Sequence, residues 1–384
     1  MLKKDNLFKN YSINLNQYSK NLKKTKRIFN SFLFDLKNNK IPMLETHDKD
    51  YEFDFSKATV KKFSNYKNII VIGIGGSILG TKSIYSFLKK KIKKNVFFFD
   101  NLDPNLHLEY KKIKNLINSC FIVVSKSGNT LETITNLRLV FSESLLKNKL
   151  VIITELKNSI LADIGNKFNA EIIEHKYFIG GRYSVLSEAG MFPAALMNLN
   201  ISKFKNLKKL TSNKNFINSL TNSIASIYTL NQKGVNNSVI LNYDSQLNDL
   251  GLWHQQLVGE SLGKKGKGIM PIVSTCPKDH HSLLQLYLDG PKNKFFTFFS
   301  STMNKNRKME SILNVQCEAT KNIFRKKKIP YRHFIIKKND ESELGSLFTF
   351  FVLETILLAR LMNINPYDQP AVEQVKIETK KLLG

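Results

Sequence analysis

Short, unbroken apolar runs separated by segments of helical length are the feature of this sequence that most restricts its fold. The runs cover residues 69–72, 96–99, 121–124 and 151–153. A strand that is apolar at every position is buried on both faces of its sheet. Such strands, alternating with helices, are typical of a parallel sheet that helices cover on both sides. The first half of the chain is therefore predicted to be an α/β unit.

The same pattern begins again after residue 200. Strand-like runs occur at 239–241, 269–273, 295–299 and 334–336, and helical stretches separate several of them. A further helical segment follows Pro370. We therefore predict an α/β architecture of two similar halves, each a parallel sheet flanked by helices, with a helix at the C-terminal side.

The length of the chain also favours two halves. It has 384 residues, and a single hydrophobic core stops growing at roughly 250–300 residues. We predict a helical segment at 1–55, one subdomain at 56–200, a second at 201–350 and a C-terminal helical segment at 351–384. No Pro-, Gly- or Ser-rich linker separates the halves, so they are expected to pack tightly.

The net charge of +28 raises the question of an anionic partner. Lysines are spread along the whole chain and form neither a basic amphipathic helix nor an RNA-binding aromatic signature. The distribution favours a lysine-biased composition over a nucleic-acid or membrane partner, and we expect neither partner. A positive field of this size would still favour the capture of a phosphorylated anion.

The cysteines and the most apolar stretch of the chain indicate the cellular compartment in which the protein is expected. Cys120, Cys276 and Cys317 are widely spaced, and an odd number cannot pair completely, which fits a reducing cytoplasm. The apolar stretch at 347–362 contains Glu354 and Arg360 and is shorter than a membrane span, so we interpret it as a buried helix.

Two loops that could bind an anion follow two of the predicted strands. The first, Gly-Ile-Gly-Gly-Ser at 73–77, contains Gly76 and Ser77 and comes before a predicted helix. Glycines let a backbone approach an anion, and a helix start offers free N–H groups. The loop matches neither a dinucleotide-binding fingerprint nor a Walker loop, and a tight turn without a ligand is the alternative.

The second loop crowds hydroxyl groups around another helix start. Residues 125–133 read Ser-Lys-Ser-Gly-Asn-Thr-Leu-Glu-Thr. Ordinary N-capping needs one or two such residues, whereas this loop has four. Because ligands of open α/β sheets lie at the carboxyl ends of the strands, the two loops together predict a phosphate site. Its expected ligands are Ser125, Ser127, Thr130 and Thr133, with Lys126 as a point charge.

These two loops resemble those of the sugar isomerase (SIS) domain, a flavodoxin-like α/β fold whose Ser/Thr loop binds the phosphate of a sugar. Further segments are similar to those of the glucose-6-phosphate isomerase family. Gly180-Gly-Arg-Tyr-Ser184 resembles a family signature and implies that Arg182 stabilises the negative charge of an enediol intermediate. A structural arginine paired with a carboxylate is the alternative.

The segment at 253–264 resembles the one that carries the family's catalytic base. The match assigns the base to Glu260 and a substrate contact to Gln256. One carboxylate on one face of the sugar can move a proton between C1 and C2. The segment departs from the family pattern at Leu262, Lys265 and Lys267.

Two more segments imply groups for ring opening. Residues 279–285 place His281, rather than His280, at the family's ring-opening histidine, with Glu132 as the residue that orients it. The C-terminal segment at 368–376 places Gln369 against substrate and Lys376 near the ring oxygen. Without the family context, Lys376 would read as a lysine on a solvated helix face.

The resemblance covers residues 65–384 and implies interconversion of glucose 6-phosphate and fructose 6-phosphate without a metal or other cofactor. It also implies a homodimer whose active sites are shared. Two alternatives stay open: an isomerase that also accepts mannose 6-phosphate, and a phosphosugar-binding regulator. The regulator would need a DNA-reading helix-turn-helix, and residues 1–55 show no convincing one.

Overall fold

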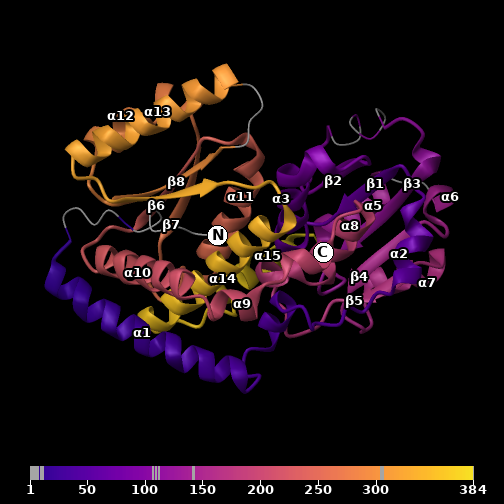
Figure 1. Ribbon diagram of the computed structural model, residues 1–384. Helices are drawn as coiled ribbons and strands as arrows, with labels where there is room; N and C mark the ends of the chain where they lie inside the picture. The colour runs from indigo at the N-terminus through magenta and orange to yellow at the C-terminus, as the bar shows by residue number, and fades with distance from the viewer. Residues whose placement is uncertain are drawn as a thin grey trace.

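Two parallel sheets, each with its own helices, form the protein (Figure 1). The computed structural model describes residues 8, 13–105, 108, 110, 113–140, 143–302 and 307–383. The first sheet has the strand order β2-β1-β3-β4-β5, which is the flavodoxin-like order. Its strands are β1 (Asn68–Ile72), β2 (Asn95–Phe99), β3 (Ser119–Val124), β4 (Leu150–Thr154) and β5 (Glu171–Glu174).

The second sheet repeats this topology with four strands in the order β7-β6-β8-β9, all parallel. The predicted fold class of two flavodoxin-like halves is therefore confirmed. Three of these strands extend the predicted runs by one to three residues at one or both ends, and β7 begins one residue later than predicted. The strands are β6 (Asn237–Asn242), β7 (Met270–Thr275), β8 (Lys294–Ser301) and β9 (Tyr331–Ile336).

The fully apolar strands of the first sheet are buried on both faces, as their sequence predicts. All five residues of β1 are buried. Ile69 and Val71 belong to the core on one face, and Ile70 and Ile72 to the core on the other. Helices on the two faces supply the partner side chains: α2 (Lys57–Ser64), α3 (Leu79–Leu88), α5 (Leu131–Val140), α6 (Glu143–Leu146), α7 (Ile160–Phe168) and α8 (Glu188–Leu196).

The two halves share one hydrophobic core, which confirms the tight packing expected from the missing linker. The same cluster contains Val71 of the first sheet and Phe299 of the second. Helices α3, α11 and α14 lie between the sheets (Figure 1). The helices of the second half are α9 (Leu207–Thr211), α10 (Lys214–Asn231), α11 (Asn248–Leu262), α12 (Leu284–Asp289), α13 (Arg307–Lys326), α14 (Glu341–Met362) and α15 (Pro370–Leu382).

Helix α14 is the apolar stretch noted in the sequence. It is longer than predicted, at 22 residues, and by length and composition it could cross a membrane, but 89% of its most apolar window is buried inside the protein. It packs against α10, α11 and the N-terminal helix α1 (Leu15–Lys37). The interpretation of this stretch as a buried core helix is confirmed.

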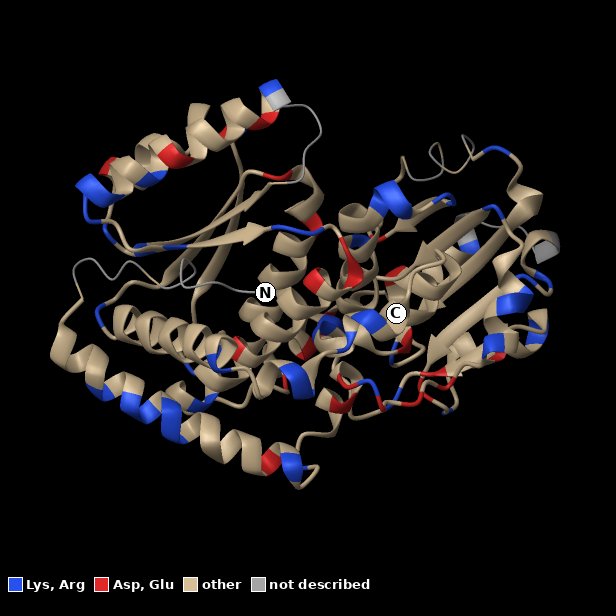
Figure 2. Cartoon of the chain, viewed as in Figure 1, with Lys and Arg blue, Asp and Glu red and all other residues tan. Residues whose placement is uncertain are grey.

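Basic residues are spread over both halves of the chain and along α1 (Figure 2). This spread agrees with the even distribution of lysine in the sequence. The division of the chain at residues 55, 200 and 350 stays a prediction.

Candidate active site

The two predicted anion loops follow β1 and β3, which are neighbours in the first sheet. The strand order reverses between these strands, and ligands of open α/β sheets bind at such a switch point. Both loops therefore lie at one edge of the sheet, the edge where a ligand is expected.

The first loop packs against the loop that carries Arg182. A Cβ atom added to Gly76 would lie 2.2 Å from the carbonyl carbon of Gly181, so the two backbones touch where no side chain fits. The hydroxyl of Ser184 donates to the carbonyl oxygen of Gly76 at 3.2 Å. Ser77 lies half-buried in the same 3₁₀ turn, Gly75–Ser77, and α3 begins two residues later.

The second loop holds its hydroxyl groups close together. The hydroxyls of Ser125 and Thr130 are 2.8 Å apart, and that of Ser127 accepts from the backbone N–H of Asn129 at 3.3 Å. The Thr133 hydroxyl is buried and has no hydrogen-bond partner among the described residues. A buried polar group without a partner is costly, so an incoming oxyanion would improve its environment.

Lys126 lies at the edge of this loop. Its ammonium donates to the carbonyl oxygen of Tyr177 at 2.6 Å and lies 3.8 Å from Glu155. Burial lowers the pKa of Lys126, and the charge of Glu155 partly offsets that effect. The residue can supply a positive charge at the loop, although a neighbouring carboxylate already faces it.

Arg182 is the centre of a buried polar cluster. Its side chain is only 1% exposed. Its Nη1 donates to Oε2 of Glu260 at 3.2 Å and to Oε1 of Gln369 at 2.6 Å. Its Nη2 donates to the backbone carbonyls of Pro366 and Asp368. The arginine thus joins residues from three distant parts of the chain.

Glu260 occupies the last turn of α11 with its side chain partly exposed, at 30%. Gln256 lies one helical turn earlier and donates to Oε1 of Glu260 at 2.9 Å. The two oxygens of the carboxylate are therefore each held by one neighbour, Arg182 and Gln256. A carboxylate that is both fixed and reachable from solvent is a suitable general base.

The glycine loop packs against Gln256. A Cβ atom added to Gly75, which has a φ of +55°, would lie 2.9 Å from Nε2 of Gln256. The Oε1 atom of Gln256 is buried and has no hydrogen-bond partner among the described residues. Its polar group is thus available to a bound hydroxyl.

Several residues that fix this cluster lie in the recognised segments but have no role predicted from the sequence. Ser261 accepts from Nε of Arg182 at 2.9 Å. The ammonium of Lys264 lies 2.8 Å from Asp368, which ties the loop after α11 to the segment before α15. The hydrogen bond from Lys264 lowers the pKa of Asp368. The signal that could have found Ser261, Lys264 and Asp368 is their place in the segments 253–264 and 368–376.

The structure does not bring the predicted ring-opening residues into this cluster. His281 is exposed at the end of a 3₁₀ turn, Lys278–His281, that follows β7. Lys376 is exposed on α15 and bonds Glu373 at 2.7 Å. Glu132 lies half-buried on α5, and none of its described contacts reaches His281. The roles of these three residues stay predictions.

The other histidine of the pair, His280, lies within hydrogen-bonding distance of a tyrosine. Nε2 of His280 lies 2.7 Å from the hydroxyl of Tyr243, and burial lowers the pKa of this histidine. His281 is therefore the histidine of the pair that is available for chemistry. Within the described part of the chain, no group of three or more His, Cys, Asp or Glu side chains could hold a metal ion.

Known proteins are similar to this chain in sequence and in fold. The family model described as phosphoglucose isomerase matches residues 46–275. A glucose-6-phosphate isomerase of Methanocaldococcus jannaschii is 33% identical over 353 residues, which cover 85% of this chain and 87% of the relative.

Two solved structures have the same fold. A hypothetical protein from Thermus thermophilus has a TM-score of 0.80 at 21% identity and 96% coverage of both chains. A glucose-6-phosphate isomerase from Chlamydia trachomatis has a TM-score of 0.72 at 20% identity, over 84% of this chain and 71% of its own. The length of the sequence match, together with its coverage of both chains, means that this protein belongs to the phosphoglucose isomerase family.

Proposed function

We propose that the protein interconverts glucose 6-phosphate and fructose 6-phosphate, the aldose–ketose isomerisation of its family. The observation that carries the proposal is the cluster in which Arg182 and Gln256 hold the two oxygens of Glu260 while Gln256 also packs against the glycine loop. The reaction needs one base that can reach both C1 and C2 and one fixed cation beside the enediol oxygens. Glu260 and Arg182 supply these two groups.

The substrate phosphate docks in the Ser/Thr loop. Its ligands are Ser125, Ser127, Thr130 and Thr133, with Ser77 and the N–H of Gly76 nearby. The close hydroxyl pair Ser125 and Thr130 and the unpartnered hydroxyl of Thr133 support this assignment. The sugar then extends toward Gln256 and Glu260. Gln369 contacts its hydroxyls from the other side.

Glu260 takes the proton from C2 of the open aldose and returns it to C1 of the enediol, so that the base ends the cycle unprotonated. Arg182 stabilises the negative charge on the enediol oxygens during this transfer. His281 and Lys376 open the sugar ring by moving a proton between the ring oxygen and the C1 hydroxyl.

The replacement Glu260→Gln tests the assignment of the base. The amide is nearly isosteric but cannot accept a proton, so we expect the rate to fall by about 10²–10⁴. Binding of a phosphosugar, measured by calorimetry, should stay within a few-fold of wild type. The matched control is Glu52→Gln, at an exposed position outside the active-site cluster, which should keep full activity. Near-normal turnover by Glu260→Gln would contradict the proposal.

We also propose a homodimer in which His281 acts in the site of the partner subunit. The exposure of His281 supports this, since its described contacts do not include Arg182 or Glu260. Helix α15 and the residue after it also expose apolar side chains that a second copy could cover: Val372, Val375, Ile377, Leu382 and Leu383.

We further propose that the protein works in the cytoplasm. Its three cysteines are buried and form no disulfide, which fits a reducing compartment.

Mixing two inactive variants tests the shared site. In a heterodimer of Glu260→Gln and His281→Ala chains, one site carries both changes and the other carries neither. Activity should therefore return to about half the wild-type level per heterodimer. If both residues act within one chain, every site stays damaged and mixing restores nothing. Sedimentation of the wild-type protein as a monomer would also reject the dimer.

A further inference from the structure

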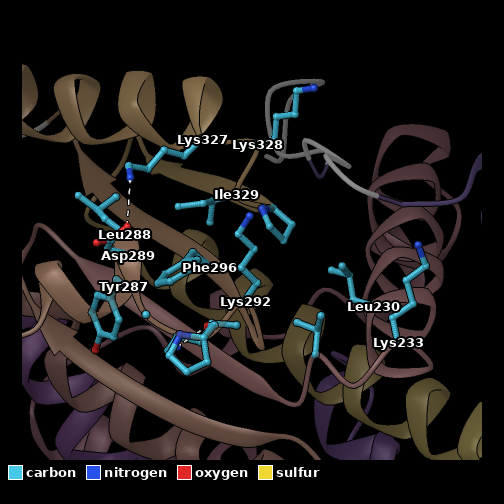
Figure 3. A pocket seen from close by; sticks show the side chains of 15 residues that line it. Leu230, Lys233, Tyr287, Leu288, Asp289, Lys292, Phe296, Lys327, Lys328 and Ile329 are labelled. Atoms are coloured by element: carbon cyan, nitrogen blue, oxygen red, sulfur yellow. Dashed lines mark hydrogen bonds and ion pairs between the residues drawn. The ribbon is translucent and has the colours of Figure 1, made fainter.

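A cavity of about 550 Å³ lies at the amino ends of β8 and β9 in the second sheet (Figure 3). The end of α10, the loop after α12, the start of β8 and the turn between α13 and β9 form its walls. It contains none of the residues assigned to the active site. Its charged lining residues are Lys233, Lys292, Lys294, Lys327, Lys328 and Asp289.

The lining is strongly basic even for this chain. Lysines make up a third of the residues around the cavity, whereas Lys and Arg together account for 59 of 384 residues in the chain. The one carboxylate in this lining, Asp289, lies 3.8 Å from Lys327 (Figure 3). Lysines thus outnumber carboxylates in this lining, which favours an anion with more than one negative group.

The described hydrogen bonds of Lys294 go to neutral acceptors. Its ammonium donates to the carbonyl oxygen of Pro291 at 2.7 Å and to Oδ1 of Asn293 at 3.0 Å, both neutral groups. The side chain is half-buried, and burial lowers its pKa. An anion in the cavity would stabilise the charged form through a stronger, charge-assisted hydrogen bond.

The floor of the cavity is apolar. Leu230, Val235 and Phe296 are buried there, and Ile329 and Pro330 form a half-buried wall. A volume of this size suits an organic ligand, and such sites combine apolar walls with a few polar groups that orient the ligand. A single phosphate ion would leave the floor and this wall uncovered.

We propose that this cavity binds a nucleoside diphosphate or triphosphate. The phosphates contact Lys292, Lys294 and Lys328, and the planar base lies against Ile329 and Pro330. This is a second binding site, apart from the sugar-phosphate site, and it does not depend on the proposed catalytic roles.

Binding of ADP to the full chain tests this inference. Equilibrium dialysis should be done at about 0.15 M salt, where screening limits long-range attraction to about 8 Å. The triple variant Lys292→Gln, Lys294→Gln, Lys328→Gln should bind ADP at least about tenfold more weakly, the loss expected for about 1.4 kcal/mol. The matched control removes three exposed lysines of α1, with Lys20→Gln, Lys23→Gln and Lys26→Gln, and should bind as wild type does.

Three results would overturn the proposal. The first is equal weakening in both triple variants, because net charge alone would then explain the binding. The second is displacement of ADP by saturating fructose 6-phosphate, which would place ADP in the sugar-phosphate site. The third is equally tight binding of pyrophosphate and ADP, which would leave no role for the apolar wall. Both triple variants should keep wild-type isomerase activity.

Discussion

Arg182 links more parts of the active site than any other side chain described above. Its three nitrogens donate to Ser261, to Glu260 and Gln369, and to two backbone carbonyls. A guanidinium has a rigid fork of donors, whereas an ammonium is a compact point charge on a flexible stem. The geometry of the site therefore requires arginine rather than any cation.

The replacement Arg182→Lys tests whether the site requires a guanidinium. We expect kcat to fall by about 10²–10³, the range for loss of one donor that stabilises a developing oxyanion. The carbonyls of Pro366 and Asp368 lose the guanidinium as a donor, although the Tyr183 hydroxyl still donates to Pro366, so unfolding should become easier by about 1 kcal/mol.

Steady-state kinetics and urea unfolding measure the two effects. Arg138→Lys, at an exposed position on α5, is the control and should change neither quantity. A kcat within twofold of wild type in Arg182→Lys would mean that a simple positive charge is sufficient.

At the residue scale, the sequence predicts which side chains form the active site. It predicts less well which groups hold those side chains in position. Arg182, Gln256, Glu260 and Gln369 were all chosen from motifs, and the structure brings them together. The acceptors at Pro366 and Asp368 are backbone carbonyls. Because every residue has such a group, no residue type marks the ones that will face an arginine.

At the scale of elements, the two glycine loops meet backbone to backbone. The contact is asymmetric: a Cβ on Gly76 would lie 2.2 Å from Gly181, but a Cβ on Gly181 would find its nearest atom 3.8 Å away. One loop is thus closed to any side chain at the contact, while the other has room for a methyl group.

This asymmetry predicts different outcomes for two similar variants. Gly76→Ala should force the loops apart, destabilise the protein by about 1–3 kcal/mol as overpacking does, and raise KM because the phosphate site moves. Gly181→Ala should stay close to wild type in both respects. Urea unfolding and steady-state kinetics measure the effects, and equal damage from the two variants would show that the loops do not pack as described.

The first sheet contains a strand that the apolar pattern did not reveal. Strand β5 has only four residues, Glu-Ile-Ile-Glu, and lies at the edge of the sheet beside β4. Three of its four side chains are half-buried, so it needs no continuous apolar run. The central strands could be predicted because burial on both faces demands apolar residues at every position.

At the scale of the whole molecule, four of the described histidines are buried in uncharged form. Burial lowers the pKa of His47, His254 and His333 to about 3 and that of His175 to about 4. In the unfolded chain these groups take up a proton near pH 6.5. Between pH 6.5 and 4 the unfolded state therefore binds more protons, and stability must fall as the pH falls.

Acid unfolding should follow this linkage. Well below pH 6.5, each unit of pH should shift the folding equilibrium about tenfold toward the unfolded state for each of these histidines. Urea unfolding at pH 7 and at pH 5 measures the difference. His47→Gln should reduce the slope by one proton. A pH-independent stability over this range would contradict the prediction.

The acceptors of Arg182 have a consequence for the order of synthesis. A ribosome makes Arg182 early, but the carbonyl of Pro366 follows 184 positions later, and Gln369 comes after that. A nascent chain can assemble the first sheet while this guanidinium still lacks those acceptors. The proposed site is thus completed from its C-terminal side, because a chain that ends before Gln369 lacks the contact of this residue with Arg182.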